Sequence, residues 1–141
     1  MRAFKFRLEK VLHIRQIKED QQKQKWALRE KAARQEQAEL ERLLVKKNDI
    51  TEFGYGQGDL RIRSAMYQYL EILDRKIKRQ QLGVKKSEEL ARQAQKEWFL
   101  ARREKEKITI LKDKHYSAYR KEKLRREQKI LDDMQPRLKG N

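Results

Sequence analysis

Histidines, glycines and carboxylates are the residues of this chain that could do chemistry, and their spacing argues against it. The two histidines, His13 and His115, belong to no close group of His, Asp or Glu residues. The chain has no cysteine, which excludes disulfides and thiolate metal ligands. A metal or catalytic site needs several such groups together. We therefore predict no metal and no cofactor, and we expect His115 to be a packed or half-exposed structural residue.

The glycines Gly54, Gly56 and Gly58 form a G-x-G-x-G run. This run is a weak signal for a phosphate-binding loop, because no Gly-Lys-Ser/Thr follows it and no strand is expected before it. The acid pairs Glu19–Asp20 and Asp132–Asp133 are direct neighbours, so on a helix their side chains point apart. No catalytic constellation remains, and we predict that the protein is not an enzyme.

Positive charge dominates the sequence, with 38 Lys and Arg against 22 Asp and Glu and a net charge of +16. Residues 1–31 hold ten basic and four acidic residues (net +6), and residues 112–129 hold eight and three (net +5). Such charge favours acidic proteins, nucleic acid or anionic lipid as partners. Acidic residues interleave with the basic ones and no nucleic-acid-binding motif is present, which disfavours nucleic acid.

Aromatic residues fall into two groups. Trp26 and Trp98 lie on the helical seams described below, where core packing is the simpler interpretation. The second group surrounds the glycine run and consists of Phe53, Tyr55, Tyr67 and Tyr69. Tyr67 and Tyr69 lie about 200° apart around a helix, so at least one should be exposed. A partner-binding patch and packing of the turn both remain open for this group.

Two long helices must position these residues, since strong helix formers dominate and the single proline is at position 136. Alternate steps of four and three residues test each half of the chain for a coiled-coil seam. In the first half the register is apolar at its ends and polar in its middle: Leu8, Leu12, Arg15, Glu19, Gln22, Trp26, Arg29, Ala33, Glu36, Leu40, Leu43, Lys47 and Ile50. In the second half it is mostly apolar or small: Met66, Leu70, Leu73, Ile77, Gln80, Val84, Ser87, Ala91, Ala94, Trp98, Ala101, Lys105, Ile108, Lys112, His115 and Tyr119.

The sequence therefore predicts an all-α fold, a single coiled-coil domain over residues 1–141 formed by a long antiparallel two-helix hairpin. We expect helix one at about 6–50, a turn at 51–60 capped by Asp59, and helix two at about 60–134, ended by Pro136 and Gly140. Folding about this turn would place Leu43 near Leu70 and Leu12 near Ala101. Helix two would then extend beyond residue 111 without a partner. No apolar run is long enough to span a bilayer, and the first ten residues lack the apolar region of a secretory signal.

Two segments of the chain resemble the FliJ family of flagellar export proteins. The opening, from Phe4 through Leu8, Val11 and Leu12 to Arg15, is similar to the family's F-x-x-x-L-x-x-V-L-x-x-R pattern. The segment Tyr69–Gln80 resembles its aromatic-x-x-x-L-x-x-x-I-x-x-Q pattern. Length, charge, the glycine-containing turn and the two-helix layout are also similar across the chain.

The resemblance implies a component of the flagellar type III protein export apparatus, a coiled coil similar to the stalk of rotary ATPases. It implies three partners: the export ATPase hexamer, the cytoplasmic domain of the export gate, and export chaperones. It also implies a cytoplasmic protein associated peripherally with the inner-membrane export apparatus, which supports flagellum assembly, motility and chemotaxis. A small-molecule substrate is not expected.

Candidate binding residues follow from the resemblance and the charge pattern together. The gate candidates lie near the turn and are Tyr69, Leu73, Lys76, Gln80, Leu43, Lys46, Lys47 and Ile50. Leu43, Ile50 and Leu73 also lie on the seam. Of the eight residues we therefore expect Tyr69, Lys76 and Gln80 to be the ones that face outward. The ATPase candidates are the basic residues at the other end: Arg2, Lys5, Arg7, Lys112, Lys114, Arg120, Lys121, Lys123, Arg125, Arg126 and Lys129. The alternatives are a generic coiled-coil scaffold of another secretion system and a basic rod that binds nucleic acid or anionic membrane.

Overall fold

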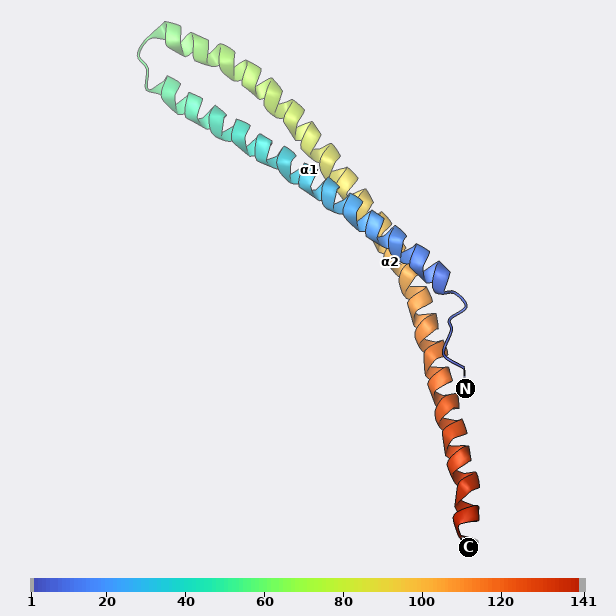
Figure 1. The fold of residues 1–141 in the computed structure, drawn as a ribbon. Coiled ribbons are helices and arrows are strands. Elements are labelled where there is room, and N and C mark those ends of the chain that lie inside the picture. Colours follow the sequence, from blue (N-terminus) through green and yellow to red (C-terminus); the bar gives the residue numbers. More distant parts are fainter. Residues whose placement is uncertain (1, 140–141) are drawn as a thin grey trace. The chain divides into compact units, whose positions relative to one another are not determined.

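A computed structural model describes residues 2–139, with side chains for residues 2–135 (Figure 1). It contains two helices, α1 (Glu9–Tyr55) and α2 (Leu60–Lys139), and no strand within the described residues. The two helices pack antiparallel against each other, which confirms the all-α hairpin. The chain forms two units, the terminal unit (residues 1–20 and 99–141) and the hairpin unit (residues 21–98).

The hairpin unit has a narrow core between α1 and α2. Leu40 and Leu43 of α1 and Leu73, Ile77 and Val84 of α2 are buried together. Farther from the turn, small residues replace these large ones on the α2 seam, and Ala91 and Ala94 are 4% and 2% exposed. Helices whose facing residues are small can approach closely and still exclude water, so this seam needs few large apolar side chains.

Trp26 and Trp98 stack across the polar middle of the first-helix register. Their ring centroids lie 5.0 Å apart at an interplanar angle of 10°. Beside them, Lys25 Nζ lies 3.2 Å from Glu97 Oε2. The two tryptophans thus pack against each other on the seam, and both remain half-buried.

The turn between the helices is shorter than the sequence predicts. α1 continues to Tyr55 instead of ending at Ile50, so only residues 56–59 connect the helices. Gly54 lies inside α1 and is buried against Met66, because a Cβ atom at Gly54 would stand 1.7 Å from Met66 Sδ. The glycine therefore serves close packing at the end of the helix pair. Asp59 caps α2 as expected, since its Oδ1 accepts a hydrogen bond from the Arg61 amide at 2.9 Å.

The later turn shifts the pairing of the helices by about one heptad, so both predicted cross-helix neighbours are wrong. In the hairpin unit, Lys47 pairs with Asp74 at 2.7 Å, which places Leu43 level with Ile77 instead of Leu70. In the terminal unit, Glu9 pairs with Lys112 and Arg15 with Glu104. These two ion pairs place Leu12 level with residue 108 instead of with Ala101.

The helix ends also differ from prediction. α1 begins at Glu9 instead of Phe6, and residues 2–6 are not helical. α2 runs through Pro136 to Lys139 instead of ending near Met134, while Gly140 lies outside the described residues. A proline removes one helical N–H, and on an exposed helix water can satisfy the carbonyl that loses its partner. Residues 123–135 are exposed, so water can reach the backbone of α2 just before the proline.

Candidate partner-binding surfaces

The terminal unit carries all eleven basic residues predicted to bind the ATPase. Ten are exposed, and Lys112 is half-buried with its Nζ 2.9 Å from Glu9 Oε2. Glu122 forms ion pairs with Arg125 and Arg126 on its own helix. No ion pair joins Arg2 or Lys5 to a carboxylate among the described side chains. The positive charge of the N-terminal segment is therefore largely uncompensated.

Residues 2–7 form an N-terminal strap that lies on α2 (Figure 1). The Phe4 ring contacts Tyr116 edge-on, with centroids 5.3 Å apart, and Tyr119 in a tilted arrangement at 5.5 Å. The Tyr119 hydroxyl donates a hydrogen bond to the Arg2 carbonyl at 2.9 Å. These contacts fix an otherwise irregular segment on the helix, and they cover part of the stretch of α2 that the sequence left without a partner.

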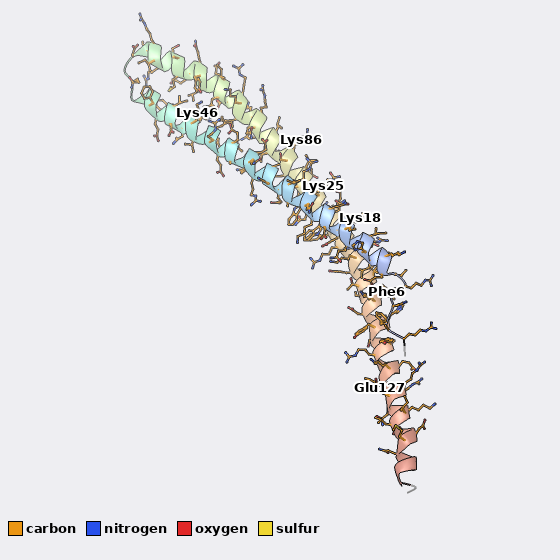
Figure 2. All side chains as sticks on the ribbon, viewed as in Figure 1. Phe6, Lys18, Lys25, Lys46, Lys86 and Glu127 are labelled. Atoms are coloured by element: carbon orange, nitrogen blue, oxygen red, sulfur yellow. The ribbon has the colours of Figure 1, made fainter. Side chains whose placement is uncertain are left out.

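Phe6 forms the second anchor of the strap (Figure 2). It is 8% exposed, and its ring meets His115 edge-on with centroids 5.6 Å apart. His115 thus packs against Phe6 but is exposed, more so than the packed or half-exposed position predicted for it. The strap was missed at the sequence level. Its signal was the alternation Phe4-x-Phe6 together with Tyr116 and Tyr119 in a stretch that is otherwise polar.

An open hollow lies beside the strap and has a volume of about 730 Å³. Phe4 and Tyr119 supply aromatic surface, and Arg2, Lys5 and Arg126 supply positive charge. The hollow brings together residues from opposite ends of the sequence, because the strap runs along α2. A concave surface of this kind can bind a ligand that is both anionic and apolar.

The structure divides the eight gate candidates into core and surface. Leu43 and Leu73 are 6% and 1% exposed, and Ile50 packs against the same core. Leu43 and Leu73 therefore belong to the core, as their position on the seam allowed, and their role in gate contact stays a prediction. Lys46 and Lys76 are exposed, and Lys47 is half-buried in its ion pair with Asp74.

Gln80 is also committed to the fold. Its Nε2 donates to the Glu36 carbonyl oxygen at 2.9 Å and to Glu36 Oε2 at 2.6 Å. The side chain is half-buried, so its predicted outward orientation is only partly correct. A polar cross-helix pair of this kind fixes the pairing of the two helices more than it attracts a partner.

Tyr69 lies at the border between core and surface. It is half-buried against the core cluster, and Lys46 Nζ lies 5.5 Å from the centroid of its ring. The pKa of the Tyr69 hydroxyl lies below its ordinary value, chiefly because of its hydrogen-bonding interaction with Lys46 and further because Lys46, Lys76 and Arg42 are positive. The positive charges around this ring would favour an acidic partner.

A second, smaller hollow of about 240 Å³ lies on this surface. It is lined by Glu39, Arg42, Leu43, Lys46, Leu73, Lys76, Arg79 and Gln80. Five of the eight gate candidates thus meet at one place, with basic side chains at its edge. Glu39 accepts two hydrogen bonds from the Arg42 guanidinium, which lower the pKa of this carboxyl and keep it charged.

The aromatic residues at the turn are largely exposed. Phe53, Tyr55 and Tyr67 are 64%, 61% and 52% exposed, while Tyr69 is half-buried. Of the two interpretations left open by the sequence, packing of the turn does not describe these three side chains. They are available for contact with other molecules.

The described residues contain no group of three or more His, Cys, Asp or Glu side chains that could hold a metal ion. No helix among them is long and apolar enough to cross a membrane.

Comparison with known proteins identifies the family. The family model described as "Flagellar FliJ protein" matches residues 4–140. Curated proteins and solved structures gave no match. The matched range includes residues 4–7 of the strap, both helices and every candidate residue except Arg2. The chain belongs to the FliJ family of flagellar protein export components.

Proposed function

We propose that this chain is a non-enzymatic stalk of the flagellar export apparatus, which binds the export ATPase hexamer through its terminal unit and the export gate through its hairpin unit. The observation that carries the proposal is the concentration of eleven exposed or half-exposed basic side chains on the terminal unit. Such a surface attracts an acidic binding site and accelerates encounter with it. Export chaperones are further partners, and peripheral attachment to the inner-membrane apparatus follows from these contacts.

The helix α2 supports a coupling role because it contributes residues to both surfaces without interruption. In the hairpin unit the buried core packs against α2, and in the terminal unit the strap packs against it.

The first experiment measures the ATPase rate and the oligomeric state of the cognate export ATPase with and without this protein at physiological salt. We expect stimulation together with hexamer formation. Reversal of charge at Arg120 and Lys121, both exposed, should weaken the effect. The same double reversal at Lys85 and Lys86 in the hairpin unit changes the net charge equally and should leave stimulation unchanged. If the folded wild-type chain does not stimulate the ATPase, the proposal that it acts as the stalk is refuted.

The second experiment addresses the gate. We expect Tyr69→Ala and Lys76→Glu each to weaken binding to the cytoplasmic domain of the gate, because both side chains present accessible surface beside the basic hollow. Lys86→Glu is the matched control, since Lys86 is exposed on the same helix in the same unit. Equal affinities for wild type and both variants would place the gate contact elsewhere.

A further inference from the structure

The hollow beside the N-terminal strap has a more specific chemistry than the basic surface around it. Arg2, Lys5 and Arg126 form a positive rim over the aromatic surface of Phe4 and Tyr119. Phe4 and Tyr119 are half-buried, so each ring still has accessible surface. The hollow thus combines aromatic side chains, which suit an apolar group, with three cations, which suit an anionic group.

We propose that this hollow binds a short acidic segment of a partner protein that carries one large apolar side chain among its carboxylates. The inference rests on the proposed function, since it assigns the chemistry by which the terminal unit recognises its partner. Arg2 and Lys5 would meet the carboxylates, and the apolar side chain would lie against Phe4 and Tyr119. Short charge-assisted contacts then add to burial of apolar surface.

The state of the rim cations supports carboxylate binding. Arg2 and Lys5 are exposed and form no ion pair with the described side chains. Arg126 contacts Glu122 only at 3.4 Å, and its side chain is 60% exposed. An incoming carboxylate would therefore not need to displace a strong internal partner of any of the three cations.

The aromatic geometry favours a side chain over a nucleic-acid base. Phe4 meets Tyr116 at an interplanar angle of 69° and Tyr119 at 46°. The Phe4 ring is thus parallel to neither tyrosine ring, so Phe4 and Tyr119, the two aromatic residues that line the hollow, do not offer a pair of parallel faces that could hold a base between them.

The strap itself belongs to the site. Phe4 is at once an anchor of the strap and a wall of the hollow, and the bond from the Tyr119 hydroxyl to the Arg2 carbonyl fixes the segment that carries two of the three cations. The hollow therefore exists only while the strap lies on α2. This arrangement pre-organises the cations and lowers the entropy cost of binding.

The test uses the full chain and three fluorescent probes of equal net charge at about 0.15 M salt. The first is a short peptide of glutamates around one phenylalanine, the second has alanine in place of phenylalanine, and the third is a single-stranded oligodeoxynucleotide. Fluorescence anisotropy measures each affinity. We expect the phenylalanine peptide to bind about tenfold more tightly than the alanine peptide and more tightly than the oligonucleotide.

Variants locate the binding. Lys5→Glu should weaken binding of the phenylalanine peptide about tenfold, whereas Lys86→Glu, with the same change of net charge, should have little effect. Phe4→Ala should abolish the difference between the two peptides. Tyr119→Phe keeps the aromatic ring and removes only the hydrogen bond to Arg2, so it should weaken binding less than Phe4→Ala. Far-UV circular dichroism checks that each variant keeps its helix content.

Equal affinity for the two peptides, tighter binding of the oligonucleotide, or absence of peptide binding would each overturn the inference. Equal losses from Lys5→Glu and Lys86→Glu would do the same, because they would reveal non-specific attraction. The ATPase measurement separates this failure from failure of the stalk. Stimulation of the ATPase without a preference for the phenylalanine peptide refutes only the inference drawn from the hollow.

Discussion

Leu73 is the most deeply buried large side chain of the hairpin unit, with 1% of its surface exposed among Leu40, Leu43, Ile77 and Val84. Truncation to alanine removes three carbon atoms from a seam that only two helices enclose. Leucine-to-alanine changes at buried positions lower the free energy of unfolding by about 2–5 kcal/mol. A seam enclosed by only two helices can partly collapse around the missing atoms, so we expect a loss of about 3 kcal/mol here. We therefore expect Leu73→Ala to lower the free energy of unfolding of the hairpin unit by about that amount.

The assay is urea unfolding of the full chain, followed by tryptophan fluorescence. Trp26 and Trp98 stack within the hairpin unit, so their emission reports on that unit, while far-UV circular dichroism reports on all helices. Leu82→Ala is the matched control because Leu82 lies on the same helix in the same unit and is 68% exposed. Its cost should stay below about 0.5 kcal/mol. Similar losses from Leu73→Ala and Leu82→Ala would refute the assignment of the seam.

Two further predictions follow from contacts near the turn. Gly54→Ala should destabilise the hairpin by about 1 kcal/mol, because the added Cβ would stand 1.7 Å from Met66 Sδ and displace that side chain. In a Met66→Ala background the same change should instead stabilise the hairpin by about 1 kcal/mol, since alanine is the better helix former. Urea unfolding of the wild type, the two single variants and the double variant measures the sign, and an unchanged sign would contradict the contact. Tyr69 should ionise below the ordinary pKa of tyrosine, and Lys46→Met should move its pKa upward. Because the folded-state pKa is lowered, the interaction adds stability only at alkaline pH and loses it as the pH falls through that pKa; ultraviolet difference titration against Tyr69→Phe tests this, and coincident titrations with and without Lys46 would refute it.

The candidate binding surfaces were predictable where they depend on charge and unpredictable where they depend on shape. A count of Lys and Arg along the chain found the basic terminal end, because net charge is a property of the sequence. The hollow was not predictable, since it needs residues 2–5 beside Tyr119 and Arg126. Among the gate candidates, Leu43 and Leu73 also lie on the heptad seam, and their exposed fractions of 6% and 1% place both side chains in the core.

Local sequence properties determined the all-α class, the two long helices and the cap at Asp59. Helix propensity, a seam of period about 3.5 and a capping side chain act within a few residues of one another, so the sequence is enough to read them. The single domain over residues 1–141 stays a prediction, and the contacts within the chain divide it into two units.

The tertiary structure alone decided the end of α1, the pairing of the helices and the strap. Glycine commonly ends a helix, but the close approach of Met66 makes Gly54 a useful residue inside one. α1 continues five residues beyond its predicted end, and Lys47 pairs with Asp74 about one heptad from the predicted pairing. A repeating heptad seam is compatible with either pairing in any local stretch. The strap depends on Phe4 and Phe6 meeting Tyr116, Tyr119 and His115, which lie more than one hundred positions away in the sequence. Contacts at such separation carry no local periodicity, so only the folded chain reveals them.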